Sequence, residues 1–301
     1  MKKKYNFKKD IPFFLMLAPA LIYLLVNSYL PMFGIFIAFK NINYQKGIFG
    51  SDWAGFKNFE FLFKTKDAGI MLRNTLGYNV LFIVLGIVLS VTLAIMLNEI
   101  GQTFLAKIAQ PLIIFPNIIS MVIVAYIVFA FLNAQTGFID KTILRNMPIS
   151  WYSEPKYWPV ILTIVNIWRA TGYGSIIYMS SIAGIDAELF EAARVDGATR
   201  IQQIFHIMIP LLKPTVVIMV LMAISKIFNS DFGLFYQVPM NSGALYNTTQ
   251  TIDTYVYRAL MELSDIGMSS AASVFQSVVG FVLVLTANKI VAKVDADNRL
   301  F

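Results

Sequence analysis

Polar side chains inside otherwise apolar segments are the residues of this sequence best placed to do chemistry. In the apolar stretch 158–182, Asn166, Arg169 and Tyr173 recur at i, i+3 and i+7, which places them on one face of a helix. Guanidinium and amide groups hydrogen-bond to hydroxyls, and an aromatic ring stacks on apolar ring faces of a solute. The face therefore suits the passage of a hydroxyl-rich solute. An internal brace, with Arg169 paired to Asp231 or to a partner chain, is an equal alternative.

A second polar group follows a later apolar segment, in the stretch SKIFNSDF. Lys226, Asn229 and Asp231 are expected either to form an internal ion pair or to line the same passage, because charge within hydrocarbon is costly and usually functional. For any one of these polar residues, hydrogen bonding between helices is the simplest role. We expect two or three of the candidates to touch a solute: Asn166, Arg169, Tyr173, Asn229, Asp231 and Gln276.

Several kinds of chemistry are disfavoured by the composition. The chain has no cysteine and one histidine, so a thiolate site, a histidine-based metal site or a catalytic triad is not expected. No G-x-x-x-x-G-K-[ST] loop is present, so any energy from ATP must be supplied by another polypeptide. The net charge is +7, but the lysines are dispersed, and nucleic acid is not an expected partner.

The apolar segments predict an all-α integral membrane protein. Hydrophobic residues make up 57% of the 301 residues and charged residues only 14%, against about 25% charged in a soluble domain. A helix needs about 20 mostly apolar residues to cross a bilayer. Six spans are predicted, at 12–29, 74–97, 111–132, 158–182, 211–228 (with 236 as the alternative end) and 270–291.

An even number of spans places both ends of the chain on the same side of the membrane. Five lysines precede the first span, and such clusters favour the cytoplasmic side. The expectation rests mainly on this cluster, since the remaining loops carry similar numbers of basic residues on both sides. The cluster consists of Lys2, Lys3, Lys4, Lys8 and Lys9.

Between the fourth and fifth spans, residues 186–205 read as two short amphipathic helices joined by a turn. Gly197 is the expected turn residue, since glycine accepts positive φ. Thr199 and Gln202 have capping-box spacing, which predicts the start of the second helix. Pro210 is expected to begin the next span, because proline is tolerated in a first turn. The segment is either an interfacial loop that stabilises the bundle or a docking element for a soluble partner.

At this segment the sequence resembles the permease subunits of bacterial binding-protein-dependent ABC importers. Their cytoplasmic loop carries Glu-Ala-Ala, three residues, Gly, nine residues, Ile, any residue, Leu and Pro. Ile209 replaces the leucine here, and every spacing is kept. Two further stretches, 17–51 and 227–238, resemble the carbohydrate branch of that family. The matching positions are Glu191, Ala192, Ala193, Gly197, Ile207 and Pro210.

The resemblance implies a type I importer fold and a set of partners. A second homologous permease, two ATPase subunits and an extracellular solute-binding protein would complete an importer of an oligosaccharide in the bacterial plasma membrane. The chain itself would be non-catalytic and hold no cofactor, with ATP and Mg bound by the partner ATPase. The loop would form the coupling helices that fit a cleft on the ATPase. No sugar-contacting position of the family aligns residue by residue.

The expected organisation has three parts. Residues 1–73 would hold the cytoplasmic N-terminus, the first span and an outer loop, residues 74–293 the transmembrane core, and residues 294–301 a cytoplasmic tail. An alternative function is a self-contained secondary transporter or channel for a small polar solute. Six spans with no visible internal repeat are few for such a protein.

Overall fold

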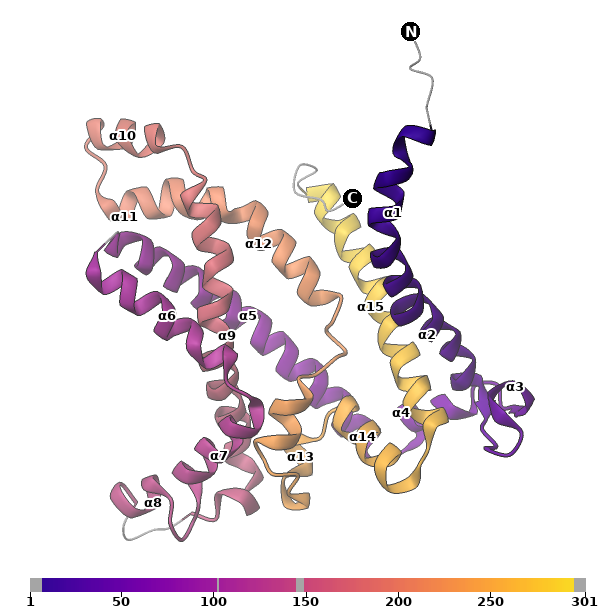
Figure 1. The fold of residues 1–301 in the computed structure, drawn as a ribbon. Helices are drawn as coiled ribbons and strands as arrows, with labels where there is room; N and C mark the ends of the chain where they lie inside the picture. The colour runs from indigo at the N-terminus through magenta and orange to yellow at the C-terminus, as the bar shows by residue number, and fades with distance from the viewer. Residues whose placement is uncertain (1–6, 102, 145–148, 295–301) are drawn as a thin grey trace. The chain divides into compact units, whose positions relative to one another are not determined.

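A computed structural model of the chain describes residues 7–101, 103–144 and 149–294, and nearly all of its regular structure is helical (Figure 1). The chain divides into two compact units. Unit 1 comprises Met1–Thr65 and Val256–Phe275, and unit 2 comprises Lys66–Tyr255 and Gln276–Phe301. The predicted basic residues at positions 2–4 and the predicted tail beyond residue 294 lie outside the described residues.

Unit 1 begins with a continuous helical run. Its candidate span, Ile11–Phe39, is 29 residues long and extends beyond the predicted 12–29. Pro31 lacks an N–H and would crowd the carbonyl four residues earlier, and the helix widens into a π turn just before it. The run contains α1 (Phe7–Leu24), the π turn Leu25–Tyr29, α2 (Leu30–Met32) and the 3₁₀ helix Phe33–Phe39.

A small cap follows this run in unit 1. Two short antiparallel strands pair Lys40 with Trp53, and the side-chain amide of Asn58 donates to the carbonyls of Ala38 (3.0 Å) and Lys40 (2.9 Å). The ring of Phe39 packs on those of three neighbouring aromatic residues. The elements are β1 (Lys40–Asn41), α3 (Gly47–Gly50), β2 (Asp52–Trp53), the 3₁₀ turn Lys57–Phe59 and α4 (Phe61–Lys64).

Unit 2 contains the remaining helices, and its first part holds a long pair that pack along one another, α5 and α9. Its elements up to that pair are α5 (Ala68–Ile100), α6 (Phe104–Ile118), α7 (Met121–Leu132), α8 (Phe138–Thr142), 3₁₀ turns at Trp151–Ser153 and Pro155–Tyr157, and α9 (Trp158–Ala183).

The second part of unit 2 holds the loop helices and the end of the bundle. In Figure 1, α10 and α11 lie at one end of α9, and α13 lies toward its other end. The elements are α10 (Ala187–Val195), α11 (Arg200–Gln203), a π turn at Ile204–Met208, α12 (Ile209–Ile224), a π turn at Gly233–Gln237, a 3₁₀ turn at Gly243–Leu245 and α13 (Tyr246–Thr249). Helices α14 (Ile252–Leu263) and α15 (Ile266–Val294) each begin in one unit and end in the other.

Small residues allow the helices of unit 2 to pack closely. A Cβ on Gly172 of α9 would overlap the backbone carbonyl of Ile113 in α6, and one on Gly174 would lie 2.6 Å from the hydroxyl of Ser90 in α5. That hydroxyl donates to the carbonyl of Thr171 at 3.3 Å. Helix interfaces in lipid are enriched in small residues, which let the backbones approach closely and gain van der Waals contact, so these contacts hold α9 against both neighbours.

Six predicted spans correspond to five candidate membrane-spanning helices and one bent pair among the described residues. The bent pair corrects the prediction of one span over 111–132: α6 and α7 meet at 97°. The backbone of Ile119 is extended there and that of Ser120 is also non-helical, and Pro116 removes a donor near the end of α6. The fifth span also differs, since its helix ends at Ile224 and not at residue 228.

Substitution of Gly172 tests the close contact of α9 with α6. Gly172→Ala should lower the free energy of unfolding by about 1–3 kcal/mol, because the added methyl overpacks the contact with a backbone carbonyl. The measurement is the apparent melting temperature of the purified protein in detergent. Gly77→Ala, where the same methyl meets open space, is the matched control. Equal melting temperatures for the two variants would contradict the close contact.

Candidate functional site

The turn at Gly197 ends α10 with a defined hydrogen-bond pattern. Gly197 has φ of +80°, as its predicted role requires. Its N–H donates to the carbonyl of Arg194 at 3.1 Å, and the N–H of Ala198 donates to that of Ala193 at 2.8 Å. This paired arrangement is the Schellman motif, which satisfies the last carbonyls of a helix. The direction of the chain after α10 therefore depends on a left-handed residue.

The start of α11 is fixed in the same way. The Thr199 hydroxyl accepts from the N–H of Gln202 at 3.3 Å, and the Gln202 side chain accepts from the N–H of Thr199 at 2.8 Å. This confirms the predicted capping box. The buried side-chain amide of Gln203 donates to the Ala198 carbonyl at 3.1 Å. The four-residue connection between the helices is thus tied to both of them.

The helix beginning at α11 does not stop before Pro210. Residues 200–224 form one continuous helix, which corrects the prediction that Pro210 begins a separate one. A π turn at residues 204–208 immediately precedes it, and the N–H of Ile209 donates to the carbonyl of Ile204. The wider π turn accommodates Pro210, which has no N–H donor and whose ring would crowd the preceding turn of a regular α-helix. The second loop helix is therefore continuous with a membrane-spanning helix.

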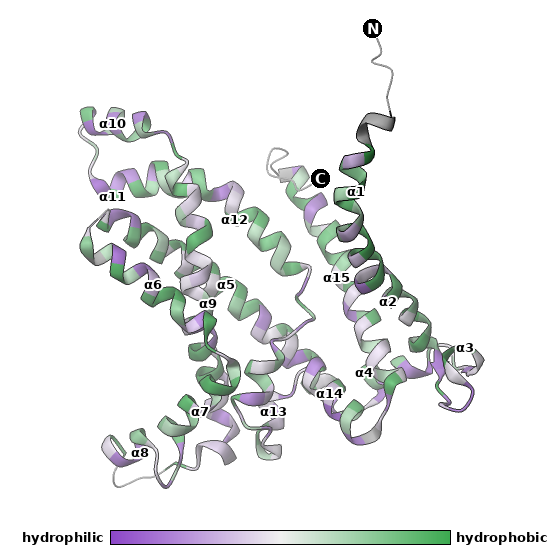
Figure 2. Cartoon of the chain, viewed as in Figure 1, coloured by the Kyte–Doolittle hydropathy of each residue, from purple (hydrophilic) through white to green (hydrophobic). Residues whose placement is uncertain are grey.

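One side of the loop is anchored in the bundle and another is exposed. Phe190 and the half-buried Ile185 pack on a core made by Ala94, Tyr178, Ile182, Met208 and Leu212. Glu191 and Ala192 are exposed, whereas Ala193 and Ile207 are half-buried. Hydrophobic and hydrophilic residues alternate along α10 and α11 (Figure 2). Large apolar side chains are left exposed at Leu189, Val195, Ile201 and Phe205.

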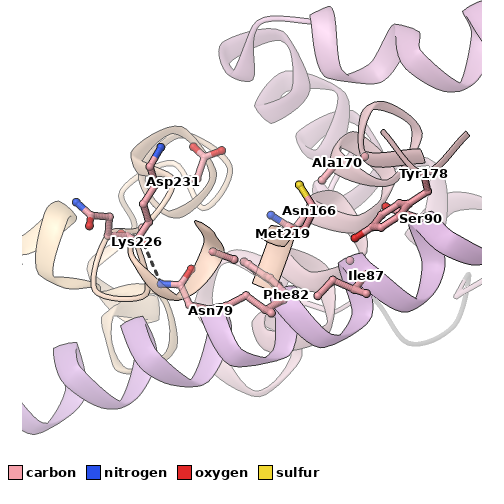
Figure 3. Close-up of a pocket in the computed structure, with 16 residues that line it drawn as sticks. Asn79, Phe82, Ile87, Ser90, Asn166, Ala170, Tyr178, Met219, Lys226 and Asp231 are labelled. Atoms are coloured by element: carbon pink, nitrogen blue, oxygen red, sulfur yellow. Dashed lines mark hydrogen bonds between the residues drawn. The ribbon is translucent and has the colours of Figure 1, made fainter. Parts of the chain in front are cut away.

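A mostly apolar cavity of about 480 Å³, with a few polar groups in its wall, lies between α5, α9 and the end of α12 (Figure 3). Of the predicted passage residues, Asn166, Asn229 and Asp231 line it. The wall combines amide and hydroxyl groups with two aromatic rings. Its other lining residues include Asn79, Phe82, Ser90, Tyr178, Lys226 and Ser230.

Arg169 does not line this cavity but braces it. Its guanidinium lies 3.5 Å from the carboxylate of Asp231 and donates to the carbonyl of Asn117 at 3.3 Å. Asn117 is at the end of α6, where helix carbonyls lack intrahelical partners. Arg169 therefore connects the bend after α6 to the segment after α12, as the brace interpretation proposes.

The two remaining passage candidates are placed elsewhere. The side chain of Tyr173 is 56% exposed and lies outside the cavity lining. Gln276 is buried, and its amide donates to the carbonyl of Phe228 at 2.8 Å and to the carboxylate of Asp253 at 3.1 Å. Gln276 thus has the helix-connecting role that was the simplest expectation for it.

Two residues that hold the cavity wall, Asn79 and Asp253, were not among the predicted site residues. The Asn79 amide donates to the carbonyls of Ile227 (2.8 Å) and Asn229 (2.9 Å). The Asp253 carboxylate accepts from the N–H and the hydroxyl of Ser230, at 2.7 and 2.8 Å. An asparagine within an apolar span was a visible signal for the first. No local pattern singled out Asp253. Among the described residues, no group of three His, Asp or Glu is arranged to hold a metal ion.

The Arg169–Asp231 pair can be tested with a double-mutant cycle. Arg169→Met should lower the free energy of unfolding by roughly 1–2 kcal/mol, because it removes the ion pair and a hydrogen bond to a carbonyl. Asp231→Asn should cost less, since that side chain is 46% exposed. We expect a coupling of about 0.5–1 kcal/mol, measured from the unfolding of the purified protein. Additive effects would show that the pair does not contribute.

Three related proteins share most of their length with this chain. It is 33% identical to "Protein LplB" of Bacillus subtilis, covering 97% of this chain and 92% of that protein. It is also 33% identical to the "Polygalacturonan/rhamnogalacturonan transport system permease protein YteP" of the same organism, covering 93% and 87%. A chain of a bacterial ABC transporter "involved in the import of the acidic polysaccharide alginate" superposes with a TM-score of 0.85 at 31% identity, covering 96% and 97%.

A family model covers the larger part of the chain. Residues 86–295 match "Binding-protein-dependent transport system inner membrane component". This region contains the loop around Gly197, the bent pair and most of the cavity lining. The family model describes an inner membrane component, which agrees with the candidate membrane-spanning helices described above. The two 33% identical relatives match over most of this chain. The chain therefore belongs to the family of inner membrane components of binding-protein-dependent transport systems.

Proposed function

We propose that this chain is a permease subunit of an ATP-driven importer that carries an oligosaccharide across the plasma membrane. The observation that carries the proposal is the loop 186–210. It holds the complete family spacing from Glu191 to Pro210 on a helix–turn–helix whose connection is tied at both ends. A permease of this kind needs a rigid element that transmits movement from a soluble subunit.

The proposed role of the loop is to dock an ATPase subunit. Val195 is 88% exposed and Ile201 68%, and large exposed apolar side chains near charged ones are typical of protein interfaces. The exposed carboxylate of Glu191 offers a charged contact to the same partner. Because the helix of α11 continues through α12, a displacement of the docked loop is transmitted directly into a membrane-spanning helix that borders the cavity.

The proposed assembly contains a second homologous permease, two ATPase subunits and an extracellular solute-binding protein. ATP and Mg are bound by the ATPases, and this chain is non-catalytic. One solved relative is described as an alginate ABC transporter "in complex with alginate pentasaccharide-bound periplasmic protein"; it has a TM-score of 0.84 with this chain at 30% identity. That title, and the carbohydrate named for YteP, support a binding protein and a sugar cargo here.

The cavity beside α5 and α9 is the proposed sugar passage. Amides such as Asn166 bind hydroxyls, and the ring of Phe82 offers an apolar surface to a pyranose.

In the proposed orientation, both termini and the loop 186–210 lie on the cytoplasmic side of the membrane. The proposed organisation keeps a transmembrane core at residues 74–293, preceded by the first span with its outer cap and followed by a short tail.

A substitution at Gly197 tests the coupling role. In the reconstituted complex, Gly197→Val should reduce sugar-stimulated ATPase activity and sugar uptake together. Holding a residue with a Cβ in the left-handed region raises the free energy of this turn by about 1–2 kcal/mol. That corresponds to a roughly 5–30-fold smaller equilibrium constant for forming the turn. The measurement is ATP hydrolysis and labelled-sugar uptake in proteoliposomes that contain all subunits.

Gly197→Asn is the matched control, because asparagine tolerates the left-handed region and should retain most of both activities. A Cβ at this position meets no neighbour within 4 Å, so the difference between the two variants reports backbone conformation and not crowding. Uptake that is equally fast for Gly197→Val and the parent protein would rule out the coupling role. Uptake that proceeds without any ATPase subunit would instead identify a secondary transporter.

A further inference from the structure

A second cavity of unit 2, of about 340 Å³, lies where the start of α5 meets α13 and the start of α9. Among the described residues, it shares no lining residue with the proposed sugar passage. The charged residue of its lining is Arg73. In the turn that precedes α9, Glu154 and Lys156 pair with each other at 3.6 Å. Arg73 is therefore the charged group that this cavity offers to a ligand.

The guanidinium of Arg73 is held in one orientation by neutral acceptors. Its Nε and Nη2 donate to the side-chain oxygen of Asn74 at 3.3 and 3.2 Å. Nη2 also donates to the backbone carbonyl of Asn247 and, at 3.2 Å, to its side-chain oxygen. In the part of the chain that the structure describes, no carboxylate lies within ion-pair distance of Arg73, and Nη1 has no acceptor. The side chain is exposed, yet it is already ordered, so a ligand at Nη1 binds a preorganised group.

The unused hydrogen-bonding capacity of this cavity consists mainly of donors. Both N–H groups of the Asn74 amide are used on backbone carbonyls, and the Tyr78 hydroxyl donates to the carbonyl of Thr248 at 2.8 Å. The side-chain oxygen of Asn247 accepts from Arg73, which leaves the amide nitrogen of Asn247 as a donor. A ligand that completes this set supplies acceptor oxygens, as a phosphate does, and arginine suits phosphate because its N–H groups form a rigid fork.

The cavity lies near the membrane–water boundary. α5 has 33 residues and is about 50 Å long at 1.5 Å per residue, whereas the hydrocarbon core of a bilayer is about 30 Å thick. About 10 Å at each end of a centred helix thus lies at headgroup level, and Arg73 is about 7.5 Å from the first residue of α5. The Thr248 hydroxyl donates to the carbonyl of Pro155 at 3.2 Å. Beside that turn lie Trp151 and Tyr157, whose rings contact each other, and such residues are enriched at the boundary.

An exposed apolar stripe of α5 runs from the cavity toward the bilayer centre. Gly77 lines the cavity one turn after Arg73, and a Cβ there would meet no atom within 4 Å. The residues that continue the stripe, at i+7, i+8 and i+11 from Arg73, are 50%, 40% and 55% exposed; they are Val80, Leu81 and Val84. A fixed cation at headgroup level above an open apolar stripe matches the two ends of an anionic phospholipid.

We propose that Arg73 binds the phosphate of an anionic phospholipid whose acyl chain lies along α5 from Gly77. Nη1 donates to one phosphate oxygen and the amide of Asn247 to another, and charge-assisted bonds of this kind are about twice as strong as neutral ones. The bound lipid contacts both α5 and α13 and stabilises their contact. In the proposed orientation of the chain, this site faces the outer leaflet.

The experiment uses the full chain with its co-purifying subunits in phosphatidylcholine nanodiscs. The discs contain a trace of phosphatidylglycerol that carries a diazirine on an acyl chain, and mass spectrometry of peptides locates the labelled residues after illumination. We expect labelling of α5 between Gly77 and Val84 that unlabelled phosphatidylglycerol competes away. Arg73→Met should reduce this labelling by roughly tenfold, the scale of one hydrogen bond to a charged group.

Gly77→Leu is the second variant, because it fills the groove and keeps the guanidinium with its partners. It should also reduce labelling, which keeps the proposal testable if Arg73→Met does not fold. Lys156→Met is the matched control, since it removes one positive charge at the same boundary from a residue outside the cavity lining. Its labelling should equal that of the parent protein.

Several outcomes would overturn the lipid site. One is equal labelling of the parent protein and Arg73→Met, and another is an equal loss of labelling in Lys156→Met. Inorganic phosphate that displaces the probe as well as phosphatidylglycerol does would identify a site for a free anion instead. A parent protein without labelling on α5 would show that another subunit covers the stripe. Because uptake is not measured, none of these outcomes affects the proposed function as a sugar permease.

Discussion

Backbone groups without a helical partner are the main constraint on this fold, because a bilayer offers no water to satisfy them. Among the places where the chain interrupts its helices in unit 2 are the bend after α6 and the turn after α12. At the first, the guanidinium of Arg169 binds the carbonyl of Asn117. At the second, Asn79 and Gln276 bind carbonyls and Asp253 binds an N–H. Polar side chains in the spans thus replace the missing backbone partners.

These interruptions create the cavity. A helix that continued past Ile224 would present side chains on all sides and keep its carbonyls internal. Because α12 ends there, the next residues form successive hydrogen-bonded turns, and several of their side chains line the cavity beside α5 and α9. The same polar residues therefore have two linked effects. They bind backbone groups that the break in the helix leaves without a helical partner, and they hold in place the segment whose side chains line the cavity.

The loop 186–210 lies at the end of the bundle and is held in one conformation by local hydrogen bonds and by packing. A short helix is not stable alone in water, but here α10 is capped at both ends, α11 begins at a capping box and continues into α12, and one face of the loop is packed on the bundle core. Gly197 is needed because only a left-handed residue allows both the Schellman pairing and the immediate start of α11. A rigid, partly apolar surface continuous with α12 follows from this local geometry.

Local and periodic features were readable from the sequence. Apolar runs located the spans, glycine and threonine spacing located the turn and the capping box, and the motif from Glu191 to Pro210 indicated the family. These depend on interactions within a few residues or on average hydropathy, which the sequence determines directly. The length of the helix through Pro210 was not readable, because a π turn can absorb a proline that otherwise ends a helix.

The partners of the polar residues were decided only by the tertiary structure. Asn166, Arg169 and Tyr173 share a predicted face, yet one lines the cavity, one braces it and one is exposed. Asp253 meets Ser230 and Gln276, each more than twenty residues away in the chain. Such contacts depend on how α5, α9 and the segment after α12 pack together. Helical periodicity determines the face on which a side chain lies, whereas packing between distant segments determines which group it meets.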